Sequence, residues 1–287
     1  MSDTITVAHV RQYNANVAFL YQQKGSKLRG KMREKVIRAK YDFFERIGPT
    51  AAQKKLVRHG ATPLMNSQHT RRRAETSDYE WADLADPQDE IRIIIQPTSA
   101  YVVNGSMAIG RSFDDEAILA FNANAREGES GDTSTAFPAE NDVVNGGTGF
   151  TVAKLLTAKE FFDTRDVDED MRHIAVSPAG ILDLLNDPQV TSADFNTVRA
   201  LVSGTLTGPF LGFNYTTTTR LPVASNIRQC FAWQANAMGM CVGMDLTSRI
   251  SERDDLGYAT QVYLMASFGG VRVLDEGVFQ IDIDESV

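Results

Sequence analysis

Apolar residues near the start of the chain recur at three- and four-residue steps. Val10, Tyr13, Val17 and Leu20 fall on one narrow stripe, which predicts an amphipathic helix, and Thr6 fits its N-cap position. A single short helix of this kind needs a surface to pack on. That surface can be the chain's own body or a second copy.

The pattern changes over residues 31–48, where apolar and charged residues alternate imperfectly and β-forming types dominate. This predicts one long charged strand, ended by Gly48-Pro49. Residues 50–86 are polar and offer little material for a core. Long structureless stretches are uncommon inside compact domains, so we expect an extended two-stranded arm. Such an arm exposes strand edges unless a partner covers them.

The middle of the chain returns to a core-forming pattern at Ile91. Residues 92–95 predict a buried strand, and Pro97 opens a helix. Residues 112–115, Ser-Phe-Asp-Asp, resemble a capping box that would begin a second helix. The polar, glycine-containing stretch 122–145 predicts an irregular loop.

Two further helix starts carry clear capping residues. Thr151 precedes an apolar face that runs to about Asp163, and Ser177-Pro178 supplies an N-cap and a first helical residue. We also expect a strand over 173–176 and an apolar core stretch over 227–244. The remaining expectations are a helix capped by Ser192 and strands at 210–221, 246–250, 259–268, 271–274 and 278–283.

Composition is that of an ordinary folded protein. With 287 residues, 43% hydrophobic and 23% charged, the chain can form one large domain or two modest ones. It has no apolar run of membrane-spanning length, and residues 1–23 lack a signal-peptide core. The two cysteines, Cys230 and Cys241, fit a reducing compartment and small buried side chains, without a disulfide framework.

Charge is distributed unevenly. Residues 1–73 carry 16 basic and 4 acidic side chains, a net charge of +12, whereas the remaining 214 residues carry 13 basic and 33 acidic ones, a net charge of −20. Three interpretations stay open at this point: a nucleic-acid-binding arm, an arm that lies on an acidic neighbour, and a merely solvated basic segment.

Motifs for catalysis or metal binding do not reach their required form. The four histidines lie in no zinc-type cluster, and no G-x-S-x-G elbow occurs. The glycines of 146–149 lack the Lys-Ser/Thr of a phosphate loop, which favours a hinge before a capped helix. The aspartates of 166–170 lack the glycine and glutamate of a calcium loop. We therefore predict no catalytic, cofactor or metal site.

Four segments, in order, resemble one known family. They are VAHVRQYNANVAFLYQQKGSKLRG, HTRRRAETSDYEWADLADPQD, PTSAYVVNGSMAIGRSFDDEAILAF and YATQVYLMASFGGVRVLDEGVFQIDI. Together they resemble the major capsid proteins of tailed bacteriophages, and the resemblance covers nearly the whole chain. It implies an α+β fold of the Hong Kong 97 type. The implied parts are an N-arm at 1–30, an extended E-loop hairpin at 31–90, a peripheral domain at 91–170 with its spine helix at 151–163, an axial domain at 171–245, and closing peripheral strands at 246–287.

The resemblance also implies a structural, non-enzymatic role. Copies would form pentamers and hexamers of an icosahedral shell around double-stranded DNA, assembled in the bacterial cytoplasm, with DNA touched only weakly. Scaffold, portal and decoration proteins are further expected partners. Two alternatives stay open. An encapsulin-type compartment would enclose a protein cargo, and a soluble hydrolase or lyase would be a monomer or small oligomer with a pocket.

The basic run on the expected arm has acidic residues close behind it and no interleaved aromatics, which favours ion pairs between proteins over stacking on bases. Reversing the charge of Arg72 should therefore block assembly and leave the subunit soluble. The predicted subunit-interface residues are Arg29, Arg71, Arg72, Arg73, Glu75 and Asp78.

Overall fold

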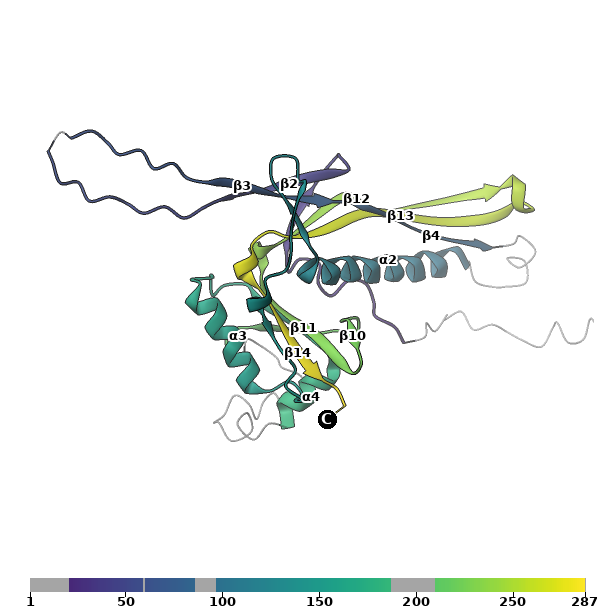
Figure 1. Ribbon diagram of the computed structural model, residues 1–287. Coiled ribbons are helices and arrows are strands. Elements are labelled where there is room, and N and C mark those ends of the chain that lie inside the picture. The colour runs from purple at the N-terminus through teal and green to yellow at the C-terminus, as the bar shows by residue number, and fades with distance from the viewer. Residues whose placement is uncertain (1–20, 59, 86–96, 187–209, 287) are drawn as a thin grey trace, which may run out of the picture. The chain divides into compact units, whose positions relative to one another are not determined.

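A computed structural model describes residues 21–58, 60–85, 97–186 and 210–286 (Figure 1). The chain forms two compact units, and neither is continuous in sequence. The first contains the segment up to Ser26 together with Ser77–Phe113 and Met244–Phe268. The second contains Lys27–Thr76, Asp114–Gly243 and Gly269–Val287. The five consecutive parts expected from the resemblance stay a prediction.

The first unit packs a helix against a pair of strands. Strand β4 (Ser77–Ala85) pairs antiparallel with β13 (Ala259–Arg272) over most of its length. Helix α2 (Pro97–Asn122) places Gly105 so close to this pair that a Cβ atom there would lie 2.5 Å from the Trp81 ring and 2.7 Å from Leu264. Only a residue without a side chain fits so close an approach.

The expected helix break at 112–115 is wrong, because α2 runs through it without interruption. The Ser112 hydroxyl donates to the carbonyl of Ala108, 3.3 Å away, as serine does inside a helix. Asp114 is fully buried and its carboxylate accepts the backbone N–H groups of Lys27 and Leu28 at 2.9 and 3.1 Å. Both side chains thus have uses other than starting a helix.

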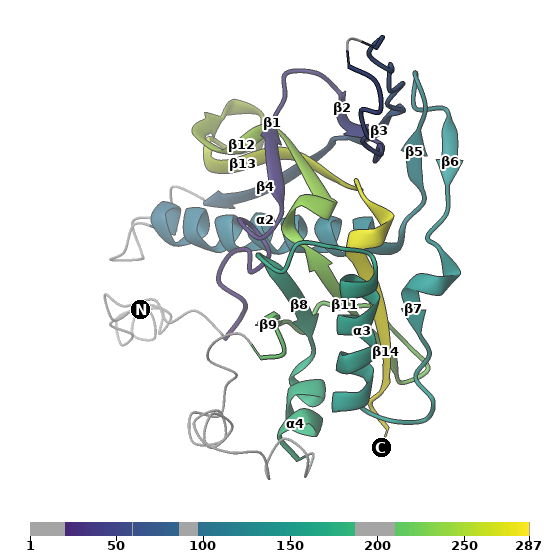
Figure 2. The ribbon, with the colours of Figure 1, turned by 90° about the vertical axis from the view of Figure 1, so that its left-hand side faces the viewer.

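The second unit is built on a mixed sheet of order β7-β14-β11-β8-β9, with β10 paired to β11. Helix α3 (Val152–Thr164) lies along β14, where Phe161 and Phe279 have ring centroids 4.5 Å apart (Figure 2). Helix α4 is Pro178–Asn186. The strands are β7 (Asp142–Val143), β8 (Arg172–Val176), β9 (Asn214–Thr217), β10 (Val223–Ala224), β11 (Ile227–Gln234) and β14 (Val278–Asp284).

The two capped helix starts are confirmed. The Thr151 side chain accepts the N–H of Lys154 at 3.5 Å, and the Ser177 hydroxyl accepts the N–H of Gly180 at 3.1 Å. Each hydroxyl satisfies a backbone donor that the first helical turn leaves open. These caps depend only on neighbouring residues, which is why the sequence predicts them.

The single strand expected over 31–48 is wrong, because the segment forms two strands in different sheets. β1 (Arg33–Val36) pairs parallel with β12 (Met238–Arg253), and β2 (Tyr41–Ile47) pairs antiparallel with β3 (His69–Glu75). Between them Ile37 enters the core, 4% exposed. A bend follows this anchor, so the two strands can join different partners.

Other boundaries also differ from expectation. Residues 122–145 are not an irregular loop throughout, since they contain β5 (Ala125–Glu127), β6 (Thr133–Thr135) and β7. Only Asn214–Thr217 of the strand expected at 210–221 is strand. The N-terminal helix, the strand at 92–95 and the helix capped by Ser192 lie outside the described residues.

Candidate functional site: a hairpin held by buried arginines

The β2–β3 hairpin carries the most exposed segment of the second unit. Its register pairs Tyr41 with Glu75, Phe44 with Arg72, and Ile47 with His69. The last backbone link runs from the N–H of Gly48 to the carbonyl of Gln68, 2.8 Å apart. Beyond it, every described residue from 49 to 66 is exposed, and none belongs to a strand (Figure 1). The loop therefore finds no cover from the described part of its own unit.

The root of the hairpin belongs to a small sheet of order β2-β3-β5-β6. β3 pairs with β5 as well as with β2, so that Arg72 lies opposite Glu127 in one register and Phe44 in the other. Three buried apolar residues, Phe44, Ala74 and Ala125, join this sheet to one hydrophobic cluster. The root is thus packed like a core even though the loop is not.

A network of buried charge fixes the root. The two terminal nitrogens of Arg72 donate to the two oxygens of Asp275 at 2.8 and 2.5 Å, and one also reaches the carbonyl of Arg272 at 3.0 Å. Arg272 donates to Asp275 at 2.6 Å and to the carbonyls of Phe121 and Ala123 at 2.9 and 2.8 Å. Burial raises the pKa of Asp275, but hydrogen bonds from the two guanidinium groups outweigh it and hold that pKa below the ordinary value.

A second ion pair ties the other hairpin strand to the same place. Arg46 on β2 pairs with Glu127, and donates to the carbonyl of Val273 at 3.2 Å. The Glu127 carboxylate also accepts hydrogen bonds from the Arg72 guanidinium at 3.4 Å and from the Thr135 hydroxyl at 3.2 Å. Both hairpin strands are therefore clamped to the chain around residue 273 and to the β5–β6 pair.

The predicted interface residues lie in different environments. Arg71 and Arg73 flank Arg72 on the more open side of β3, and lie over the rings of Phe43 and Tyr41 at 4.4 and 5.1 Å. Arg73 also pairs with Glu75 at 3.4 Å. Alternation along the strand separates these two arginines from the one between them.

Two predicted residues lie away from β3. Arg29 is exposed and pairs with Glu34 at 3.7 Å, and Asp78 is exposed on β4 in the other unit. Arg72 differs from all of them in burial, because it is 1% exposed and its ion pairs with Glu127 and Asp275 are in the interior. Burial leaves Arg72 little surface to offer a neighbour, and contacts of all six predicted residues with a neighbour stay a prediction.

Sequence reasoning missed two features of this site. One is the set of partners of Arg72, namely Glu127, Arg272 and Asp275. The other is the apolar character of the loop, in which Leu56, Val57, Leu64 and Met65 are 85%, 65%, 89% and 39% exposed. The signal for the second was available, since residues 49–68 contain these side chains among Lys54, Lys55 and Arg58, with no acidic residue.

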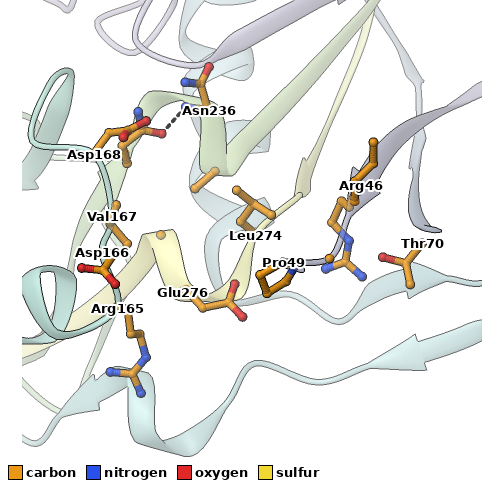
Figure 3. A pocket seen from close by; sticks show the side chains of 15 residues that line it. Arg46, Pro49, Thr70, Arg165, Asp166, Val167, Asp168, Asn236, Leu274 and Glu276 are labelled. Atoms are coloured by element: carbon orange, nitrogen blue, oxygen red, sulfur yellow. Dashed lines mark hydrogen bonds between the residues drawn. The ribbon is translucent and has the colours of Figure 1, made fainter. Parts of the chain in front are cut away.

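A groove of about 520 Å³ lies beside the root of the hairpin (Figure 3). Arg46, Pro49 and Thr70 line one side, the turn 165–168 lines the other, and Leu274 and Glu276 lie between them. Arginine and acidic side chains both face it, so it carries no single sign of charge. Within the described residues, no three histidine, cysteine or acidic side chains are grouped as metal ligands would be.

The glycine-rich turn before α3 is organised by one lysine. The ammonium group of Lys154 donates to the carbonyls of Asn145, Thr148, Gly149 and Asp282 at 2.7 to 3.0 Å. The lysine thus joins the turn to β14. The sequence favoured a hinge at 146–149, whereas these hydrogen bonds hold the turn in place.

A half-buried carboxylate pair lies on the same sheet. Burial, and then the nearby Asp282 carboxylate, raise the pKa of Asp142 from 3.8 to about 6. Oδ1 of Asp142 has no hydrogen-bond partner among the described residues. Cys230 and Cys241 are buried and unpaired, as expected. In the described part of the chain, no helix is both long and apolar enough to cross a bilayer.

Comparisons with known proteins converge on one kind of molecule. A family model described as phage capsid protein matches residues 5–285. The capsid structure of cyanophage P-SCSP1u matches with a TM-score of 0.73 at 15% identity, over 96% of this chain and 93% of that chain. The capsid of Ralstonia phage GP4 matches with a TM-score of 0.72 at 11% identity, over 96% of this chain and 95% of that chain. A chain of Mycobacterium phage Che8 matches with a TM-score of 0.70 at 12% identity, over 96% of this chain and 97% of that chain. No curated protein sequence matches the chain.

Proposed function

This chain belongs to the phage capsid protein family, and from that premise we propose that its copies form pentamers and hexamers of an icosahedral shell around double-stranded DNA. It is a major capsid protein with a fold of the Hong Kong 97 type. The encapsulin alternative is not favoured. Shell assembly in the bacterial cytoplasm, weak contact with DNA, and scaffold, portal or decoration partners are part of the proposal.

The observation that carries the proposal is the uncovered loop at 49–68. Leu56 and Leu64 expose most of their side chains, although burial of a leucine is worth about 1.5–3 kcal/mol. The chain thus holds apolar area that a neighbouring copy can cover, as obligate assemblies do. The same loop carries Lys54, Lys55 and Arg58 and no acid, whereas the chain after residue 73 has a net charge of −20. Opposite charge would guide the loop of one copy onto an acidic surface of the next.

The interface we propose combines that loop with the exposed predicted residues. Arg71, Arg73 and Glu75 lie at the hairpin root and Arg29 and Asp78 elsewhere, and each retains some exposed surface. The ion pairs of Arg29 with Glu34 and of Arg71 with Glu45 lie at the surface, and such pairs exchange at little cost. They can therefore re-pair with a neighbour during assembly.

The division of the chain into capsid domains also remains a proposal. We keep an N-arm at 1–30, an E-loop at 31–90, peripheral parts at 91–170 and 246–287, and an axial domain at 171–245. Within the peripheral part, α2 is 26 residues long and α3 is 13. The greater length makes α2 the better candidate for the spine helix.

The test compares two substitutions in one exposed loop. Leu64→Ser removes an apolar contact, and Thr62→Ser is a matched control at an exposed position two residues away. We expect Leu64→Ser to lower the yield of closed particles in electron micrographs and sedimentation velocity. The melting temperature of the unassembled subunit should not change, because exposed substitutions seldom alter stability by more than about 0.5 kcal/mol.

Two outcomes count against the proposal. Equal particle yields from Leu64→Ser and Thr62→Ser would remove the loop from the interface. Failure of the unaltered chain to form particles under any assembly condition would contradict the capsid function itself.

A further inference from the structure

The turn before α3 contains an asparagine followed by a glycine. Gly146 and Gly147 have positive φ angles of 59° and 65°, which are typical of the two central residues of a type I′ β-turn. The N–H of Thr148 closes the turn onto the carbonyl of Asn145 at 3.1 Å. Among the described residues, no hydrogen bond engages the side chain of Asn145 or the N–H of Gly146. Both groups are therefore available to react with each other.

The main-chain carbonyl of Asn145 accepts hydrogen bonds from three donors. The ammonium group of Lys154 donates at 2.7 Å, and Thr148 donates through its N–H at 3.1 Å and through its hydroxyl at 3.0 Å. Donors that converge on one oxygen stabilise negative charge that develops there, and a charged donor does so most strongly. Lys154 is 8% exposed, and its other three acceptors are also neutral carbonyls. The position thus favours an anion over the carbonyl that occupies it.

We propose that Asn145–Gly146 is a site of spontaneous covalent modification, at which the asparagine becomes isoaspartate. Solvent base removes the N–H proton of Gly146, and the negative charge is shared with the carbonyl oxygen of Asn145, where the three donors stabilise it. The Gly146 nitrogen then forms a bond to Cγ of Asn145. The bond from Cγ to the side-chain nitrogen breaks, and that nitrogen takes up a proton and leaves as ammonia. The product is a five-membered succinimide ring.

Water opens this ring at one of its two carbonyls. Attack at Cγ breaks the bond from Cγ to the Gly146 nitrogen and gives aspartate, whereas attack at the main-chain carbonyl of residue 145 gives isoaspartate. Lys154 and Thr148 hold the oxygen of the main-chain carbonyl, so they stabilise the charge that this second attack places on it. In isoaspartate that carbonyl has become the free carboxylate. Burial lowers the pKa of Lys154, and the new carboxylate would stabilise its charged form.

The turn leaves room for the ring to close. A Cβ atom added at Gly146 or at Gly147 would find no other atom within 4 Å. Both glycines and Thr148 are exposed, so water and solvent base reach the reacting groups. Glycine also leaves its own nitrogen unshielded, whereas a larger side chain would crowd it.

A second Asn-Gly pair in the same chain supplies a matched control. Asn104–Gly105 lies inside α2, where N–H groups are bound to the carbonyls four residues back. The side chain of Asn104 is also engaged, because its Oδ1 accepts a hydrogen bond from Gln22 at 3.1 Å. We therefore expect this pair to stay intact in the folded chain.

Incubation of the folded subunit at mildly alkaline pH tests the site. Peptide mapping by mass spectrometry reports the loss of ammonia at each asparagine, and electron-transfer fragmentation separates isoaspartate from aspartate. We expect modification at Asn145 and none at Asn104. In urea both pairs should react, and the share of isoaspartate at position 145 should be smaller than in the folded chain, because the donors are no longer assembled. An Asn145 that stays intact in the folded chain while the unfolded chain is converted would overturn the proposal.

Two variants test the role of the donors. Thr148→Val removes one donor at an exposed position, and should lower the rate at Asn145 several-fold and reduce the share of isoaspartate, with little change in melting temperature. Asn145→Gln should abolish the reaction, because its ring would need one more atom. An unchanged rate and product ratio in Thr148→Val would overturn the role assigned to the donors. None of these measurements requires assembled particles, so their outcome is independent of the capsid function.

Discussion

Arg72 and Asp275, 203 positions apart in the sequence, form a two-armed ion pair with N–O distances of 2.8 and 2.5 Å. The guanidinium is 1% exposed, and its planar fork matches the two oxygens of the carboxylate. This pair fixes the root of an exposed hairpin to the end of β13. Arg72 is thus a residue of the subunit's interior.

Replacement of Arg72 should destabilise the subunit itself. Arg72→Met leaves Asp275 and Glu127 without one of their cationic partners, and the loss of one member of a buried pair costs about 3–5 kcal/mol. We expect a decrease of that order in the free energy of unfolding, measured by urea denaturation of the unassembled subunit. Charge reversal at Arg72 should then yield misfolded protein, contrary to the soluble, assembly-deficient subunit expected from sequence.

The neighbouring arginine supplies the control for that measurement. Arg71 lies on the more open side of the same strand, and its pair with Glu45 at 3.8 Å is a surface contact. Arg71→Met should cost less than about 1 kcal/mol. Equal destabilisation by the two substitutions would show that burial of Arg72 is not what matters.

Asp142 should make the subunit less stable as the pH rises. Its pKa is about 6 in the folded chain and near 3.8 when unfolded, so between these values the unfolded chain releases a proton that the folded chain keeps. Folding stability is therefore lost as the pH rises through this window. Asp142→Asn should raise the free energy of unfolding at pH 7 by about 1 kcal/mol, allowing for solvent screening of a half-buried group.

Urea denaturation at several pH values between 4 and 7 checks this, with Glu129→Gln as the control. That substitution removes the same charge from an exposed position. A stability profile for Asp142→Asn that runs parallel to the unaltered chain across the window would contradict the assignment.

Gly105 should not tolerate alanine, although alanine favours helices by about 1 kcal/mol over glycine. The added methyl group would lie 2.5 Å from Trp81 and 2.7 Å from Leu264, so α2 must move away from β4 and β13. Overpacking of this kind costs about 1–3 kcal/mol. We expect Gly105→Ala to lower the melting temperature of the subunit, and Val103→Ala, at a position 40% exposed, to change it little. A higher melting temperature for Gly105→Ala would show that the gain in helix propensity outweighs the cost of overpacking.

Features that depend on adjacent residues could be predicted from the sequence. Thr151 and Ser177 cap their helices because each hydroxyl meets an N–H only three residues away. Ser112 has the same local chemistry, yet its hydroxyl bonds to Ala108 inside a continuous helix. Local pattern cannot separate these cases, because Asp114 is held by backbone groups of residues 27 and 28, far away in the sequence.

The candidate site shows the same limit. The exposed hairpin follows from a long segment with little core-forming content, and this much was predicted. All three arginines were predicted at the interface, although alternation along a strand places Arg72 on the face opposite Arg71 and Arg73. Whether the Arg72 face of β3 is buried or exposed depends on the positions of Asp275 and Glu127. Those positions are set by the pairing of strands that are far apart in the sequence.

The arginine clamp has a mechanical consequence for the hairpin. A load applied to the tip would pass down both strands to Arg46 and Arg72, and each is held by a carboxylate and by a backbone carbonyl. The described part of 49–68 has no strand partner to resist bending. Bending should therefore be concentrated in the loop, while the root of the hairpin and the β5–β6 pair move together as one rigid body.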